Sequence, residues 1–280
     1  MVKIIADTLS CIPLEKAHQL GIDIIPQIIE FGDNESYRDD TEIDSATFLK
    51  KLRLATTLPH TAAPPPALYT PIYERLSAEG NTILVICPSA QVSGTVRSAE
   101  VAAKEFPNAD IRVIDTKSVA SGLGMMVLKA YEWAQQGLDA DTIIARILEM
   151  ASRERIYFLV DTLEYLQKGG RIGKAQALFG SLLQVKPILA FREGHTEPVE
   201  SQRTKRRAIA RLCEIVLETC PHRPDSYISV MQADAEEDAN YLADYFKNCL
   251  GIKDIQIFFL PPAILVHAGP GALGVSYFVP

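Results

Sequence analysis

Short runs of apolar, largely β-branched residues recur through the first half of the chain, and few of them alternate with polar residues. Thr82–Cys87 and Ile111–Ile114 are the clearest, and Ile4–Ala6 and Ile22–Ile29 resemble them. Such runs are typical of parallel strands covered on both faces. The stretches that fit intervening helices are Leu14–Leu20, Leu68–Ala78, Thr95–Phe106, Gly122–Gln136 and a helix capped by Asp141. Strands that alternate with helices predict a parallel α/β layered domain.

The pattern changes after about Arg155. Strand candidates are Tyr157–Val160, Lys186–Phe191, Tyr227–Met231, Ile255–Phe259 and Ile264–His267, and helix candidates are Thr204–Glu218 and Glu236–Cys249. Arg192–His195 lies between two strand-like runs and is typical of a hairpin turn. We therefore expect residues 1–155 to form an N-terminal α/β domain and residues 156–280 a C-terminal α+β domain with a mixed or antiparallel sheet.

The charge of the chain is uneven. The net charge of −7 argues against a general nucleic-acid binder, so no nucleic acid is expected as a partner. Between Asp161 and Arg211, ten basic residues stand against five acidic ones, which gives +5 locally and leaves −12 for the remainder. A basic face on an acidic protein suits an acidic partner or a phosphate. A solvated face without a partner fits the same composition.

The five cysteines form no Cys-x-x-Cys pair and no zinc-like spacing with histidine, so no metal site is expected. Their odd number in a long chain is typical of reduced thiols in the cytosol. Met1–Asp7 is too short an apolar run for a signal peptide and is predicted to be the first strand. No stretch approaches the length of a membrane span. The sequence therefore predicts a cytoplasmic protein without a transmembrane segment.

The run Thr162–Gly173 is the most distinctive motif. It begins like a turn of amphipathic helix and breaks at the adjacent Gly169 and Gly170, directly before Arg171. Paired glycines allow positive φ angles or a close approach that other residues resist. A sharply shaped turn rimmed by basic side chains is therefore expected here.

Four further segments combine small and polar residues: His60–Pro64, Ser89–Thr95, Asp115–Gly124 and His267–Gly274. In the second of them, Ser93 follows a predicted strand and precedes a helix that begins near Gly94. The first turn of a helix offers backbone N–H groups and a positive dipole end, which suit a carboxylate or a phosphate. A serine there also serves as an ordinary helix cap.

Taken in this order, the motifs resemble those of the DegV family, bacterial proteins that bind a fatty acid between two α/β domains. Asp7-Thr8, Lys186–Leu189 and Arg203–Lys205 extend the resemblance over essentially the whole chain. The resemblance implies a two-domain DegV-like fold with the ligand site at the interdomain cleft. It implies that Thr61, Ser93 and the N–H of Gly94 hold the carboxylate of a long-chain fatty acid, and that His267 lies in the nearby polar network.

The resemblance also implies that the chain is not an enzyme and needs no cofactor besides its bound fatty acid. Such proteins present the acid to a separate fatty acid kinase, which phosphorylates the carboxyl group with ATP. Arg171 and Arg203 are the candidates for docking of that kinase, because the family has basic residues there and both lie in the +5 segment.

Several positions depart from the family pattern in the same direction. Alanine replaces the more usual Ser, Gln, Ser and Thr at Ala62, Ala63, Ala90 and Ala268. Each loss of a hydrogen-bond donor costs roughly 0.5–1.5 kcal/mol. These alanines leave open an interaction protein with a vestigial lipid pocket.

One enzyme class is an alternative to binding alone. Ser93 with His267 could serve a serine acyl hydrolase, although Gln91 and Thr95 replace the glycines of a nucleophile elbow. Gly122-x-Gly124 is not a dinucleotide fingerprint, because Val127 occupies the third glycine position. These two glycines fit either close helix packing or room beside a ligand.

Overall fold

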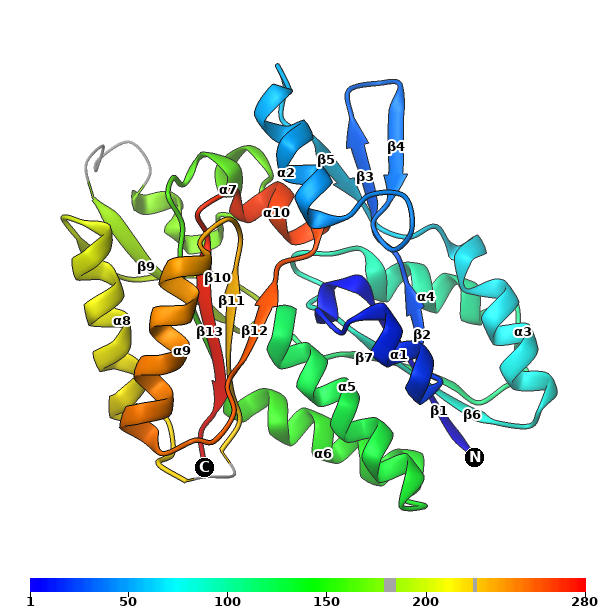
Figure 1. The fold of residues 1–280 in the computed structure, drawn as a ribbon. Coiled ribbons are helices and arrows are strands. Elements are labelled where there is room, and N and C mark those ends of the chain that lie inside the picture. Colours follow the sequence, from blue (N-terminus) through cyan, green and yellow to red (C-terminus); the bar gives the residue numbers. More distant parts are fainter. Residues whose placement is uncertain (179–184, 224–225) are drawn as a thin grey trace. The chain divides into compact units, whose positions relative to one another are not determined.

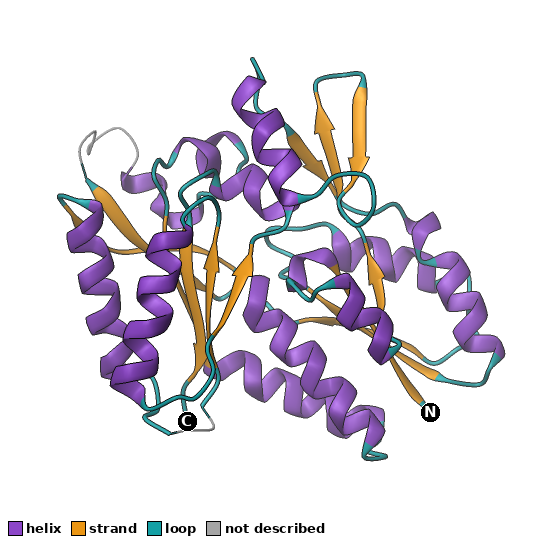
Figure 2. Ribbon diagram, viewed as in Figure 1, coloured by secondary structure: helices purple, strands orange, loops and turns teal. Residues whose placement is uncertain are grey.

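The computed structural model describes residues 1–178, 185–223 and 226–280 (Figures 1 and 2). The chain forms two compact units, which we describe separately. The first comprises Met1–Ser152 and Pro261–Ala263, and the second comprises Arg153–Leu260 and Ile264–Pro280. The first unit therefore includes three residues from late in the chain.

The first unit is built on a four-stranded sheet in the order β2-β1-β6-β7, in which every pair is parallel. The strands are β1 (Val2–Asp7), β2 (Asp23–Ile25), β6 (Thr82–Cys87) and β7 (Ile111–Asp115). Ile5 pairs with Val85 in the centre of the sheet, and both are buried. The parallel layered domain predicted from the unalternating apolar runs is confirmed.

The helices of this unit are α1 (Leu14–Leu20), α2 (Ser45–Leu54), α3 (Thr70–Ala78), α4 (Thr95–Ala103), α5 (Ala120–Gln135) and α6 (Ala140–Arg153), with short 3-10 turns η1 (Thr8–Ser10) and η2 (Pro66–Leu68). The prediction that Asp141 caps α6 is wrong. Asp139 does so, since its carboxylate accepts from the backbone N–H and the hydroxyl of Thr142, both at 2.9 Å. Asp141 lies in the first turn and pairs with Arg112.

The run Ile22–Ile29, predicted as one strand, is divided between two sheets. Pro26 follows β2, and β3 (Ile28–Phe31) then belongs to a separate antiparallel sheet in the order β4-β3-β5. Its other strands are β4 (Glu35–Arg38) and β5 (His60–Ala62). The break leaves the buried Gln27 between the sheets, with its side chain directed into the unit.

The second unit holds a six-stranded mixed sheet in the order β10-β9-β8-β13-β11-β12. Its strands are β8 (Glu154–Leu159), β9 (Lys186–Arg192), β10 (His195–Gln202), β11 (Ile228–Gln232), β12 (Gln256–Phe259) and β13 (Leu273–Phe278). Neighbours are antiparallel except β11 and β12, which are parallel. The mixed sheet and the hairpin at Arg192–His195 are both confirmed.

The helices of this part of the chain are α7 (Glu164–Lys168), η3 (Gly173–Leu178), α8 (Lys205–Thr219), α9 (Glu236–Leu250) and α10 (Pro262–Ala268). The prediction of a strand at Ile264–His267 is wrong, because these residues lie in α10. Periodicity cannot separate a short buried strand from a buried helical turn. Pro262 at the helix start is the better guide, since proline is favoured in a first turn.

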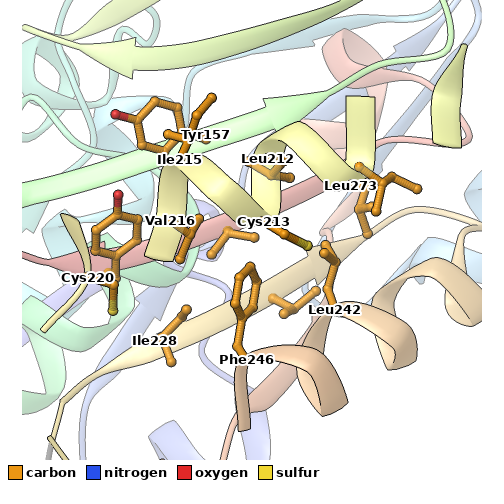
Figure 3. Close-up of a cluster of buried hydrophobic side chains, with 14 of the residues drawn as sticks. Tyr157, Leu212, Cys213, Ile215, Val216, Cys220, Ile228, Leu242, Phe246 and Leu273 are labelled. Atoms are coloured by element: carbon orange, nitrogen blue, oxygen red, sulfur yellow. The ribbon is translucent and has the colours of Figure 1, made fainter. Parts of the chain in front are cut away.

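Helices α8 and α9 cover one face of the six-stranded sheet (Figure 3). Leu212 and Val216 of α8 and Leu242 and Phe246 of α9 are fully buried there, in one cluster with Tyr157 of β8. Close packing of this kind leaves little room for rearrangement. The core thus gives a firm base to the loops at the strand ends of this unit, where the Thr162–Gly173 and His267–Gly274 motifs lie.

Candidate functional site

The turn between β6 and α4 presents Ser93 and Gly94 at the start of a helix. Gly94 is the N-cap of α4 and is exposed, whereas Ser93 is half-buried. The Ser93 Oγ accepts from the backbone N–H of Thr95 at 3.3 Å and shares a hydrogen bond with the Thr95 Oγ1 at 2.8 Å. The positive end of the α4 dipole therefore lies beside a hydroxyl, an arrangement suited to an anion.

Two of the other predicted motifs meet this turn. A Cβ placed on Gly94 would lie 3.0 Å from the Cβ of Ala63, so the His60–Pro64 segment packs closely against the helix start. From the third motif, Asp115 accepts from the backbone N–H of Ala90 at 3.3 Å. Thr61 is half-buried in β5, opposite Ile29. The structure thus brings the first three polar motifs together within the first unit.

A buried polar network lies directly behind Ser93 and Thr95. The Gln27 side-chain amide donates to the Thr95 Oγ1 at 3.0 Å and to the Asp7 Oδ2 at 2.8 Å. The Thr95 hydroxyl is 3.3 Å from the same Asp7 oxygen. All three of these side chains are buried. A continuous line of hydrogen bonds therefore runs from the Asp7 carboxyl to the Ser93 hydroxyl.

Asp39 adds a second carboxyl to this network. It accepts from the Thr8 hydroxyl at 2.8 and 3.0 Å and from the backbone N–H of Gln27 at 2.8 Å. Burial, followed by the charge of Asp39, raises the pKa of Asp7 to about 8. Burial likewise raises the pKa of Asp39 to about 7. Two carboxyls in one buried network disfavour ionisation, so both titrate near neutral pH and Asp7 is the more strongly protonated of the two.

Sequence reasoning missed Gln27 and Asp39 altogether and noted Asp7 only as part of a motif. One usable signal was the position of Asp7 at the carboxyl end of the first parallel strand, because ligands of open α/β sheets bind near such ends. Nothing local marked Gln27 or Asp39, which are 20 and 31 residues from their partners Asp7 and Thr8.

His267 lies in the second unit, near the end of α10, and is half-buried. Its ring packs against the turn at Gly169 and Gly170, the glycine turn. A Cβ on Gly169 would lie only 2.2 Å from the imidazole Nδ1. Gly269 has a φ of +72°, and a Cβ placed on it would lie 2.3 Å from the Tyr165 ring. Both predicted uses of the paired glycines are present, since Gly170 has a φ of +70°. The Thr162–Gly173 and His267–Gly274 motifs therefore pack together.

Comparison with known proteins decides the family. The family model described as "Uncharacterised protein, DegV family" matches residues 1–279. The chain belongs to the DegV family. A DegV domain-containing protein of Streptomyces coelicolor is 38% identical over 279 residues, which are 98% of this chain and 97% of the relative.

Solved DegV structures share the fold over the whole chain. The fatty acid-binding DegV of Bacillus subtilis is 31% identical and aligns with 100% of this chain and 99% of its own, with a TM-score of 0.88. A DegV family protein from Thermus thermophilus, solved for its fatty acid binding, is 29% identical, with the same coverage and a TM-score of 0.90. The predicted DegV-like architecture is confirmed.

The two arginines proposed for docking have different surroundings within the DegV fold. Arg171 is half-buried, and its Nη1 donates to the Gly169 carbonyl at 2.8 Å. Burial lowers the pKa of its guanidinium. Arg203 is exposed and immediately precedes Thr204, whose hydroxyl caps α8 by accepting from the N–H of Arg207 at 3.2 Å. Arg171 therefore helps to shape the glycine turn, whereas Arg203 is a surface cation.

The glycine pair in α5 is explained at one position by packing. A Cβ on Gly124 would lie 2.3 Å from the Ser10 carbonyl oxygen, so the helix could not approach η1 with a larger residue there. Close packing, rather than room for a ligand, thus accounts for Gly124.

The described part of the chain contains no group of three His, Cys, Asp or Glu residues arranged to hold a metal ion. All five cysteines are free thiols. Across residues 1–178, 185–223 and 226–280, no helix has the length and apolar character needed to cross a bilayer.

Proposed function

We propose that this protein binds a long-chain fatty acid whose carboxylate lies at the turn ahead of α4. The observation that carries the proposal is the Ser93–Gly94 turn, where a hydroxyl and the first N–H groups of a helix lie beside the His60–Pro64 segment, which includes Thr61. Fatty acid binding by DegV proteins 29% and 31% identical over their full length supports it. Ser93, Gly94 and Thr61 bind the carboxylate, and His267 is a further ligand-binding residue.

The acyl tail and the headgroup contribute differently to affinity. Each buried methylene contributes about 0.8 kcal/mol, so a long chain supplies most of the binding free energy. The headgroup contacts fix the position of the carboxylate. Ala62, Ala63, Ala90 and Ala268 offer no side-chain donors, which leaves backbone N–H groups, the Ser93 and Thr61 hydroxyls and the His267 ring as the headgroup donors.

The protein presents this carboxylate to a separate fatty acid kinase and performs no chemistry itself. Positioning of a reacting group is the contribution that such a binding subunit makes. The +5 segment between Asp161 and Arg211 supports a partner with an acidic surface. Arg203, exposed at the start of α8, is the stronger docking candidate, and Arg171 contributes through the turn that it shapes.

The test is purification without added lipid, followed by native mass spectrometry and solvent extraction. We expect about one long acyl chain per protein, or uptake of added palmitate or oleate to that level. A protein that is repeatedly lipid-free and takes up neither acid would contradict the proposal and favour a vestigial pocket. Labelling of Ser93 by a fluorophosphonate probe, with hydrolysis of an activated acyl ester, would favour the acyl hydrolase instead.

A further inference from the structure

We propose that Asp7 is a positioning residue that controls whether Ser93 offers its hydroxyl proton to a bound carboxylate, so that ligand binding and proton uptake at Asp7 are coupled. The inference rests on the proposed function, because it concerns the headgroup held at Ser93. It adds a residue that does not touch the ligand, and it predicts a pH dependence that originates inside the first unit.

The hydrogen-bond partners of Gln27 and Ser93 fix most of the network. Gln27 donates both amide hydrogens, one to the Asp7 Oδ2 and one to the Thr95 Oγ1. The Thr95 backbone N–H occupies one lone pair of Ser93. The remaining freedom is the direction of the hydroxyl protons along the Asp7–Thr95–Ser93 line, and a threonine hydroxyl has one proton and two lone pairs to distribute.

When Asp7 is protonated, each group along the line donates its hydrogen bond outward, from Asp7 toward Ser93. The carboxyl O–H donates to the Thr95 Oγ1, whose two lone pairs are then filled by Asp7 and Gln27. The Thr95 hydroxyl must therefore donate to Ser93. Both lone pairs of Ser93 are then occupied by Thr95, so the Ser93 proton remains available for a carboxylate, which only accepts.

When Asp7 is ionised, the direction of hydrogen-bond donation reverses, so that each hydroxyl donates inward, toward Asp7. The Thr95 hydroxyl donates to the Asp7 carboxylate, and the Ser93 proton is drawn inward to the Thr95 Oγ1. Ser93 then presents a lone pair to the ligand. A lone pair opposite a carboxylate is repulsive, and the new negative charge behind it adds to the repulsion. Binding of an anion is therefore weaker in this state.

The surroundings of Asp7 raise its pKa, so that its ionisation falls in a pH range where binding can be measured. Its Oδ1 is buried and has no hydrogen-bond partner among the described residues, which disfavours the charged form. Burial and the nearby Asp39 raise the pKa of Asp7 to about 8, while hydrogen bonds from Thr95, Gln27 and the Leu9 backbone oppose this shift.

Apart from Asp39, the titratable groups with a resolved electrostatic link to Asp7 are uncharged at neutral pH. Burial, together with the nearby charge of Asp7, raises the pKa of Cys11, Tyr69 and Cys87, so these groups stay protonated beside it. Asp39 is thus the one ionisable neighbour, among those with a resolved effect on Asp7, that titrates in the same pH range.

The experiment measures palmitate binding by calorimetry between pH 6.5 and 9.5 for the wild type, Asp7→Asn and Asp39→Asn. If only protonated Asp7 is competent, the apparent Kd at pH 9.5 is about 30-fold above its value at pH 6.5, given a pKa of about 8. Asp7→Asn should abolish this ratio. Ionisation of palmitate itself contributes equally to all three proteins and cancels in the comparison.

Asp39→Asn is the matched control, since it removes a carboxyl from the same network but not from the line to Ser93. Loss of its charge lowers the pKa of Asp7, so the pH step should persist and move to lower pH. Carboxyl carbon NMR of the ligand-free wild type follows the Asp7 titration directly, and serves with Asp39→Asn if Asp7→Asn does not fold.

The outcomes separate this inference from the proposed function. The role of Asp7 would be overturned if palmitate binding had the same pH profile in the wild type and in Asp7→Asn. It would also be overturned if the midpoint of the pH step did not move in Asp39→Asn. Neither result would contradict fatty acid binding itself. The proposed function itself would be overturned if neither the wild type at pH 6.5 nor any variant bound palmitate.

Discussion

Gly169 lies so close to His267 that a Cβ at residue 169 would be 2.2 Å from the imidazole Nδ1. Its φ of −77° is open to any residue, so contact rather than backbone conformation requires glycine here. At Gly170 the reverse holds, because its φ is +70° and a Cβ there would have no neighbour within 4 Å. Adjacent glycines thus serve different purposes in one turn.

Gly169→Ala should therefore displace the His267 ring, and Gly170→Ala should not. We expect changed imidazole resonances and weaker retention of bound fatty acid in the first variant. The second should lose roughly 1–2 kcal/mol of stability from strain, with unchanged His267 resonances. Nitrogen NMR of the imidazole and thermal unfolding check both. Identical His267 spectra in the two variants would show that the ring has room to move.

Ser93→Ala should weaken fatty acid binding and leave the fold intact. A hydrogen bond to a charged group is worth roughly 1.5–3 kcal/mol, so the Kd should rise at least tenfold. Ser98→Ala is the matched control, because Ser98 lies on the same helix one turn later. Titration with a fluorescent fatty acid measures both. Equal affinities in the two variants would place the headgroup elsewhere.

The raised pKa of Asp7 also predicts how stability depends on pH. An unfolded aspartate titrates near pH 4, whereas Asp7 in the fold titrates near 8, so the native state binds the extra proton between these values. Its contribution to stability is thus complete below pH 4 and is lost as pH rises toward 8. Asp7→Asn should show a flatter dependence of Tm on pH across this window. A parallel decline in both proteins would assign the dependence to other groups.

Asp139→Ala should destabilise the first unit more than Asp141→Ala. The first change removes the cap of α6, which typically costs about 1 kcal/mol. The second removes an exposed ion pair with Arg112, and exposed pairs contribute roughly 0–1 kcal/mol. Denaturant unfolding of the two variants gives the comparison, and a larger loss in Asp141→Ala would contradict the capping geometry.

The double change Arg171→Ala with Arg203→Ala should retain the bound lipid but slow acyl phosphate formation by the cognate kinase with ATP. Charges at an interface rim mainly steer association, so the defect should shrink as salt rises. The single variants separate docking from a structural role, because Arg171 also donates to the Gly169 carbonyl within the glycine turn, whereas Arg203 is a surface cation. Turnover equal to that of the wild type at low salt would mark the +5 segment as a solvated face.

How well the sequence predicted the fold depended on the length of each apolar run. The six-residue run of β6 was recognised because it is long and unalternating. The sheet of β3, β4 and β5 was missed because its strands have only three or four residues and each includes polar residues. The motifs located the Ser93 turn, yet Gln27 and Asp39 could not be found, since only the tertiary fold joins them to Asp7 and Thr8.

The short return of Pro261–Ala263 to the first unit has a consequence for synthesis on the ribosome. Asp39 accepts a hydrogen bond from the backbone of Ala263, which is made more than a hundred residues after Ser152. At ~5–20 residues per second, this partner arrives roughly 5–20 seconds after the first 152 residues. A nascent first unit must wait through that interval with a buried carboxyl incompletely paired. A fragment cut at residue 152 would remain in that condition permanently.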